Sequence, residues 1–175
     1  TNVKDKTPLQ RAIQKLLARE TKDKRKIYDK KVSIEALDRM VELNIARYFK
    51  GYEYEVIKSK TIPVDMDGIS IRISPEVIVK IIIDGHTVLG GVKIHISKRK
   101  PFDYRQCQYS SILLSKCITD NFAKDGETVL PELCLTVDVF SNRVVPAKED
   151  YSLEISHIQF ICNDIKSRWP SNPYN

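Results

Sequence analysis

A seven-residue apolar run, Val77–Ile83, constrains the fold of this chain more than any other feature. It contains one lysine and is far shorter than the roughly 20 apolar residues of a membrane span, so it predicts a buried strand. Asp84 and Gly85 follow directly, and this pair is a strong signal for a tight hairpin turn. Residues 87–97 then predict the longest strand of the chain. A central hairpin of this kind needs a β-sheet whose faces other elements cover.

Helical and strand periodicities alternate along the rest of the chain. Thr7 and Pro8 open a first helix, and Pro170 ends the last. Ser33 caps a second helix that ends at Gly51, after a charged connector at residues 22–31. Further elements are a helix at about residues 103–118 and strands at residues 52–57, 69–73, 133–140 and 143–145. The apolar face predicted for the last helix consists of Ile158, Ile161, Ile165 and Trp169. This order predicts the α/β (α+β) class, with a central mixed β-sheet flanked by helices.

Positive charge is concentrated near the beginning of the sequence. The 175 residues include 29 Lys+Arg and 23 Asp+Glu, which gives a net charge of +6. Residues 1–31 hold 11 basic and 4 acidic side chains, which leaves 18 basic and 19 acidic side chains in residues 32–175. We therefore predict a basic N-terminal helical segment and linker at residues 1–31, followed by a nearly neutral α/β domain at residues 32–175.

The cysteines and histidines exclude several classes of site. Four cysteines, all with apolar neighbours, include no Cys-x-x-Cys pair: Cys107, Cys117, Cys134 and Cys162. This pattern favours reduced core thiols in a cytoplasmic protein over disulfides or an iron–sulfur site. The three histidines lack zinc-binding spacing. No secretory leader or membrane span is visible, which favours a cytoplasmic location without a membrane partner.

Two segments of the central hairpin carry polar side chains of the kinds that enzymes use in catalysis. Pro75 and Glu76 predict a turn that delivers a carboxylate at the start of the first hairpin strand. In the second strand, Gly91, Lys93 and His95 alternate with apolar residues and therefore share one face. Because the hairpin makes the two strands neighbours, we expect Glu76 and Lys93 to lie close together.

This arrangement resembles the PD-(D/E)xK nuclease superfamily, particularly its Holliday-junction-resolvase and RecB-like branches, over about residues 33–118. In that family a helical acid precedes a Pro-Asp turn, and an acidic-x-Lys triplet follows one hairpin later, before another helix. Pro75 and Glu76 match the turn, with the longer acid in place of Asp. Lys93 matches the family lysine, and Glu42 is the candidate for the helical acid.

The chain departs from the family pattern at two positions. Gly91 stands two residues before Lys93, where the family has Asp or Glu. Arg105 stands four residues before Tyr109, where the RecB-like helix has glutamine. A complete site requires Glu42, Glu53 or Glu55 to replace the missing carboxylate, which depends on the fold bringing one of them to the site.

The resemblance implies a restriction-endonuclease-like fold and metal-dependent hydrolysis of DNA phosphodiesters, with Mg²⁺ or Mn²⁺ as cofactor. Glu76, Lys93 and Glu42 would then be the catalytic residues. Glu76 and His95 would hold the metal ion. Basic side chains around the site would contact DNA phosphates: Lys98, Arg99, Lys100 and Arg105.

Three functions stay open from the residues themselves. The first is the metal-dependent deoxyribonuclease. The second, which Gly91 favours, is a catalytically decayed module of the same fold that binds DNA or a protein partner. The third is a structural or partner-binding α/β protein, in which Glu76 is a solvated turn residue and Lys93 blocks aggregation at a strand edge. In that third reading His95 is an ordinary strand histidine. A homodimer is compatible with all three.

Overall fold

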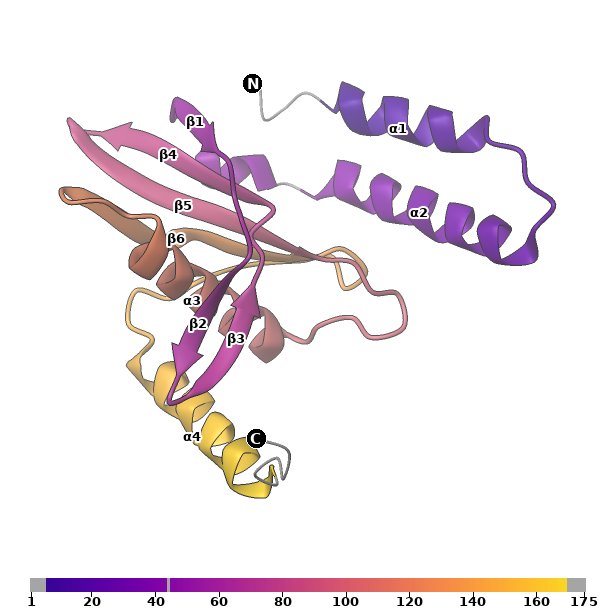
Figure 1. Ribbon diagram of the computed structural model, residues 1–175. Coiled ribbons are helices and arrows are strands. Elements are labelled where there is room, and N and C mark those ends of the chain that lie inside the picture. Colours follow the sequence, from indigo (N-terminus) through magenta and orange to yellow (C-terminus); the bar gives the residue numbers. More distant parts are fainter. Residues whose placement is uncertain (1–5, 44, 170–175) are drawn as a thin grey trace.

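The computed structural model describes residues 6–43 and 45–169 of the chain (Figure 1). Its helices are α1 (Thr7–Leu17), α2 (Lys24–Glu42), the short 3-10 helix η1 (Ile45–Phe49), α3 (Tyr104–Asn121) and α4 (Ser152–Arg168). Its strands are β1 (Tyr54–Ile57), β2 (Ile62–Met66), β3 (Ile69–Ile73), β4 (Val77–Ile83), β5 (His86–His95), β6 (Glu127–Asp138) and β7 (Arg143–Pro146). A five-stranded mixed sheet is flanked by helices, so the predicted α/β (α+β) class is confirmed. The predicted helix stop at Pro170 lies outside the described residues.

The central sheet has the strand order β1-β4-β5-β6-β7, and β2 and β3 form a separate hairpin. β4 and β5 make the predicted hairpin, and Asp84 and Gly85 at its turn have φ angles of 50° and 79°. An Asp-Gly pair adopts this turn easily, and the turn sets the register that pairs Val77 with Val92. Helix α3 then connects β5 to the parallel strand β6, and β1 and β7 are antiparallel edge strands.

Both faces of the sheet are covered along the middle of β5. On one face, Ile112, Leu114 and Ile118 of α3 are fully buried and pack with the β2–β3 hairpin and α4. On the other face, Ala36 of α2 and Phe49 of η1 cover a second apolar cluster. Residues 88–92 of β5 are therefore buried, and the polar side chains of this strand lie at its two ends, with Lys93 and His95 at the second of them.

Helix α2 begins earlier than the sequence pattern predicted. Asp23 caps it, because its carboxylate accepts hydrogen bonds from the backbone N–H groups of Arg25 (2.9 Å) and Lys26 (3.4 Å). The predicted start at Ser33 and the charged connector at residues 22–31 are wrong: lysine and arginine are good helix formers, and nothing between the cap and Glu42 breaks the helix. The predicted boundary between residues 31 and 32 consequently falls inside α2.

Two further details differ from the sequence-based expectations. Strand β2 was not predicted, although its alternating residues Ile62, Val64 and Met66 and the following Asp-Gly turn carried the signal. In α4 the buried residues are Ile158 and Cys162. The rest of the predicted apolar face is not buried, so that part of the prediction is wrong. Ile165, for example, is 42% exposed, because the last turns of α4 extend beyond the neighbouring core.

The interior is mainly apolar, and its thiols are buried. All four cysteines are buried and free, as their spacing predicted. Burial raises the pKa of the Cys107 thiol to about 11 and that of Cys134 to about 12, so both stay protonated near neutral pH. Within the described residues, every helix is too short or too polar to cross a membrane.

Helices α1 and α2 form an antiparallel hairpin that extends away from the sheet (Figure 1). Lys30 closes the hairpin, since its Nζ donates to the backbone oxygens of Leu17 and Arg19, both at 2.9 Å. The other end of α2 is attached to the body through Arg39, whose Nη1 donates to the backbone oxygen of Phe140 (3.3 Å). The hairpin is therefore anchored at one end and surrounded by solvent at the other.

A second attachment joins α2 to the loop that follows β5. Glu35 pairs with Lys98 of that loop and with Arg39, the latter at 3.2 Å. The hydrogen bond from the Lys98 ammonium is the main reason why the pKa of Glu35 lies below its usual value of 4.5. The pair links the helical hairpin to residues that the sequence marked as phosphate contacts.

The stabilising effect of Glu35 is expected to disappear in acid. The pKa of Glu35 is lower in the folded state than in the unfolded state. Its contribution to the free energy of unfolding is therefore fully present above about pH 4.5, and it is lost as the pH falls through the pKa of the folded state. Urea midpoints of the wild type and Glu35→Gln measured between pH 3 and 7 check this. The wild type should be the more stable at neutral pH, and the two midpoints should converge in acid. A constant gap across this range would contradict the assignment.

Candidate functional site

Glu76 and Lys93 lie together at the open end of the β4–β5 hairpin, as predicted. The Lys93 Nζ donates to Glu76 Oε1 at 2.8 Å. The second carboxylate oxygen accepts the backbone N–H of Ile94 at 2.6 Å. The Glu76 N–H in turn donates to the Val92 oxygen at 2.9 Å and extends the ladder beyond β4 by one bond. Both oxygens of this carboxylate are thus engaged with the neighbouring strand.

The packing around Gly91 explains why no acid stands two residues before Lys93. A Cβ atom at this position would lie 2.7 Å from Ile118 Cδ1 and 3.1 Å from the Val77 oxygen, where α3 packs onto the sheet. Leu114 of α3 closes the same space. Because a carboxylate there would clash and lose its hydration, the close approach of α3 selects glycine at this position.

His95 is held by the loop that follows β5. Its ring stacks on Phe102 with the centroids 3.6 Å apart and the planes 7° from parallel. Its Nε2 lies 3.0 Å from the Lys100 backbone oxygen and 3.8 Å from Asp138 Oδ2. Through these contacts the His95 side chain holds the loop against the end of β5.

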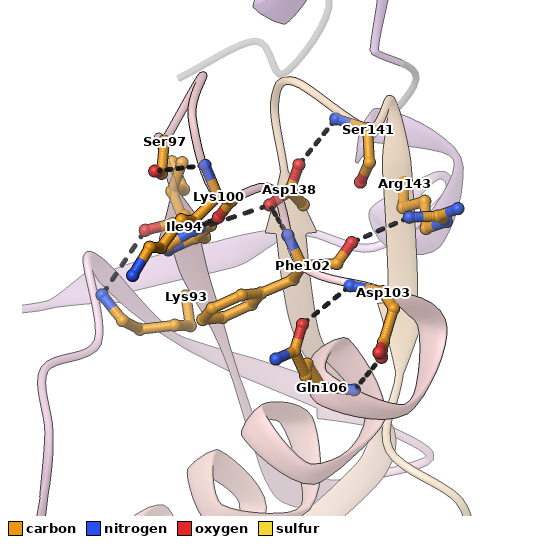
Figure 2. Close-up of polar contacts among 11 residues, drawn as sticks. Lys93, Ile94, Ser97, Lys100, Phe102, Asp103, Gln106, Asp138, Ser141 and Arg143 are labelled. Atoms are coloured by element: carbon orange, nitrogen blue, oxygen red, sulfur yellow. Dashed lines mark hydrogen bonds and ion pairs between the residues drawn. The ribbon is translucent and has the colours of Figure 1, made fainter.

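Asp138 is a fully buried carboxylate at the end of β6 that sequence reasoning missed (Figure 2). Its Oδ2 accepts the Phe102 N–H at 2.8 Å, and its Oδ1 accepts the Ser141 N–H at 2.6 Å. The carboxylate therefore joins the loop after β5 to the β6–β7 turn. The only sequence signal for this role was an acid at the junction of an apolar strand and a Ser-Asn turn.

The far end of the loop is equally well held. Arg143 Nη1 donates to the Phe102 backbone oxygen at 2.8 Å. Asp103 and Gln106 form a reciprocal capping box at the start of α3, with bonds of 2.8 and 2.9 Å (Figure 2). We call residues 98–100, between these fixed ends, the basic loop: Lys98, Arg99 and Lys100.

The remaining predicted site residues do not join the Glu76–Lys93 pair. Glu42 is exposed at the last residue of α2, and Arg105 is exposed in the first turn of α3. Among the described residues, no three or more His, Cys, Asp or Glu side chains gather in a way that could hold a metal ion. The ligand set that the resemblance implies for Mg²⁺ or Mn²⁺ is therefore not assembled around Glu76 and His95.

Comparison with protein-family models, with curated proteins and with solved structures gives no match for this chain. The resemblance to the PD-(D/E)xK superfamily stays a prediction that rests on the sequence motifs.

A basic surface extends from the helical hairpin to the basic loop. Residues 6–31 carry ten Lys or Arg and three Asp or Glu. A hollow near the hairpin turn is lined by Glu20, Thr21 and Ile27 together with four basic side chains: Arg19, Lys22, Lys30 and Lys31. The Glu35–Lys98 pair brings this surface into contact with the basic loop. Such a concentration of cations on one projecting element gives it a positive electrostatic potential.

Proposed function

We propose that this protein binds nucleic acid through phosphate contacts made by the α1–α2 hairpin and the basic loop, without cleaving it. The observation that carries the proposal is the attachment of the basic hairpin to the basic loop through Glu35 and Lys98. Two cationic segments that are distant in sequence become one surface, which a phosphate backbone can follow.

The order of elements around the Glu76–Lys93 pair supports a PD-(D/E)xK-like origin for this module. Helix α2, the Pro75 turn, the β4–β5 hairpin and α3 occur in the order of the family pattern, with η1, β1 and the β2–β3 hairpin between α2 and the turn. The packing of α3 over Gly91 supports the decayed alternative, because the position of the family acid is closed by apolar side chains. In this proposal the Glu76–Lys93 pair secures the start of the hairpin.

Phosphodiester hydrolysis is a second candidate function. One contact favours it: the Glu76 carboxylate and the Lys93 ammonium, which match two family positions, are 2.8 Å apart and both partly exposed. Cleavage of plasmid, branched or single-stranded DNA in Mg²⁺ or Mn²⁺, with loss of cleavage in Glu76→Ala, would establish this function. Absence of cleavage would leave the binding function as proposed.

The binding function predicts a steep and localised salt dependence. Each cation–phosphate contact contributes about −0.9 to the slope of log K against log salt for duplex DNA. Replacing the three basic-loop residues with glutamine should therefore reduce the magnitude of the slope by about two to three and weaken binding at every sequence. Fluorescence anisotropy with a labelled 20-base-pair duplex between 50 and 250 mM KCl measures both.

A matched variant controls for net charge. It removes three exposed cations outside the hairpin and the basic loop: Lys50, Arg72 and Lys124. The slope of this variant should stay close to that of the wild type. If the two triple variants lose affinity equally, binding is a net-charge effect and the proposed surface is wrong.

A further inference from the structure

Tyr28 lies on the side of α2 that faces the basic loop. It precedes Glu35 by seven residues and Arg39 by eleven, which are about two and three helical turns, so the three share one face. Glu35 contacts Lys98, and Arg39 contacts the β6–β7 turn, which settles the direction of that face. The opposite face carries Lys30, which bonds the end of α1. Tyr28 therefore lies on the same side of α2 as Glu35 and the basic loop, nearer the free end of the hairpin.

The surroundings of Tyr28 are cationic and open. Its side chain is 49% exposed. Lys24, Arg25 and Lys31 lie one helical turn from it, and none of them forms an ion pair within the described part of the chain. Two acids lie near it on α2: Asp29 is the next residue, about 100° round the helix from Tyr28, and Glu35 on the same face is paired with Lys98. An aromatic ring is thus presented between two sets of cations.

We propose that this face binds single-stranded nucleic acid, with Tyr28 stacking on an unpaired base while cations of α2 and the basic loop hold the flanking phosphates. The inference rests on the proposed function and adds the form of nucleic acid that is bound. In a duplex the base faces are covered by their neighbours, so an exposed ring has nothing to stack on. In a single strand each base has a free face, and an aromatic ring within a basic surface binds it with little sequence preference.

The test compares four labelled probes with the full-length protein in 100 mM KCl. They are oligo(dT) and oligo(U) of 20 nucleotides, an abasic strand with the same number of phosphates, and a 20-base-pair duplex. Tyr28→Ala should raise the Kd for the two strands with bases roughly 5- to 150-fold, which corresponds to the loss of one stacked base. It should leave the Kd values for the abasic strand and the duplex within about twofold, because their contacts are electrostatic. Comparison of oligo(dT) with oligo(U) distinguishes DNA from RNA as the preferred strand.

Three variants serve as controls. Tyr28→Phe keeps the ring and should bind like the wild type. Tyr28→Leu keeps apolar bulk without a ring and should behave like Tyr28→Ala. Tyr52→Ala removes another exposed aromatic ring, 40% exposed and outside the hairpin and basic loop, and should have no effect. Alanine and leucine are better helix formers than tyrosine, so α2 persists, and unchanged duplex binding confirms this in the same experiment.

Two results separate the failure of this inference from that of the proposed function. Salt-dependent binding of all four probes, with no selective effect of Tyr28→Ala, would overturn the stacking site and leave phosphate binding intact. Equal weakening of the abasic strand would also overturn it, because stacking requires a base. Absence of binding to every probe, even at 50 mM KCl, would overturn both proposals.

Discussion

Asp138→Ala is expected to lower the free energy of unfolding by about 3 kcal/mol, one of the largest effects of a single substitution in this protein. The carboxylate is fully buried and accepts the backbone N–H groups of Phe102 and Ser141 at 2.8 and 2.6 Å. Removing it leaves two donors without their charged acceptor, at about 1–3 kcal/mol for each group. The loop after β5 and the β6–β7 turn then lose their common anchor.

Equilibrium urea unfolding measures this effect, with the midpoint falling and the m value unchanged. Asp138→Asn keeps the volume and one acceptor oxygen, so its loss should be intermediate. Asp120→Ala is the matched control, because that carboxylate is 44% exposed in a surface pair with Lys116 and contributes at most about 1 kcal/mol. An Asp138→Ala variant as stable as the control would show that the network has no structural role.

Placing an acid at position 91 through Gly91→Asp, as the PD-(D/E)xK pattern would have it, is expected to destabilise the protein by roughly 3–5 kcal/mol and to create no cleavage activity. The new Cβ would meet Ile118 Cδ1 at 2.7 Å and the Val77 oxygen at 3.1 Å. The carboxylate would lie against α3, where apolar side chains surround it. Overpacking accounts for about 1–3 kcal/mol of the loss, and burial of an unpaired charge accounts for the rest.

Gly91→Ala isolates the steric part of this loss. The clash involves the terminal methyl group of Ile118, so Ile118→Val, which removes that methyl, should relieve it. Ile118→Val alone costs about 0.5–1.5 kcal/mol, and the double variant should therefore be more stable than the sum of the single changes predicts. Additive losses would mean that α3 does not restrict Gly91. Cleavage by a folded Gly91→Asp variant would show that the site accepts the acid after all.

The Glu76–Lys93 pair was predictable because its causes are local. Alternation places Lys93 on the polar face of β5, and the Asp-Gly turn sets the register that brings Val77 opposite Val92. Glu76 precedes Val77, so the register alone carries its carboxylate to the neighbouring strand. The start of α2 was harder to predict from the sequence, because a run of lysine and arginine has helix propensity but lacks the apolar stripe that marks an amphipathic helix.

The role of Asp138 and the closure of Gly91 were not predictable, because both depend on contacts between segments far apart in sequence. Asp138 bonds Phe102 across 36 residues, and Gly91 meets Ile118 of α3. A buried acid and an exposed acid look the same in a sequence. The buried face of α4 also depended on where the neighbouring core ends, which periodicity does not report.

By itself, the sequence determined every strand except β2, the central hairpin, the adjacency of Glu76 and Lys93, and the concentration of positive charge in residues 1–31. These follow from side-chain alternation, turn chemistry and composition, which act over a few residues. Only the tertiary structure decided that α3 closes the position of the family acid, and that Glu35 and Lys98 join the basic hairpin to the basic loop. Packing brings together residues that no local pattern connects.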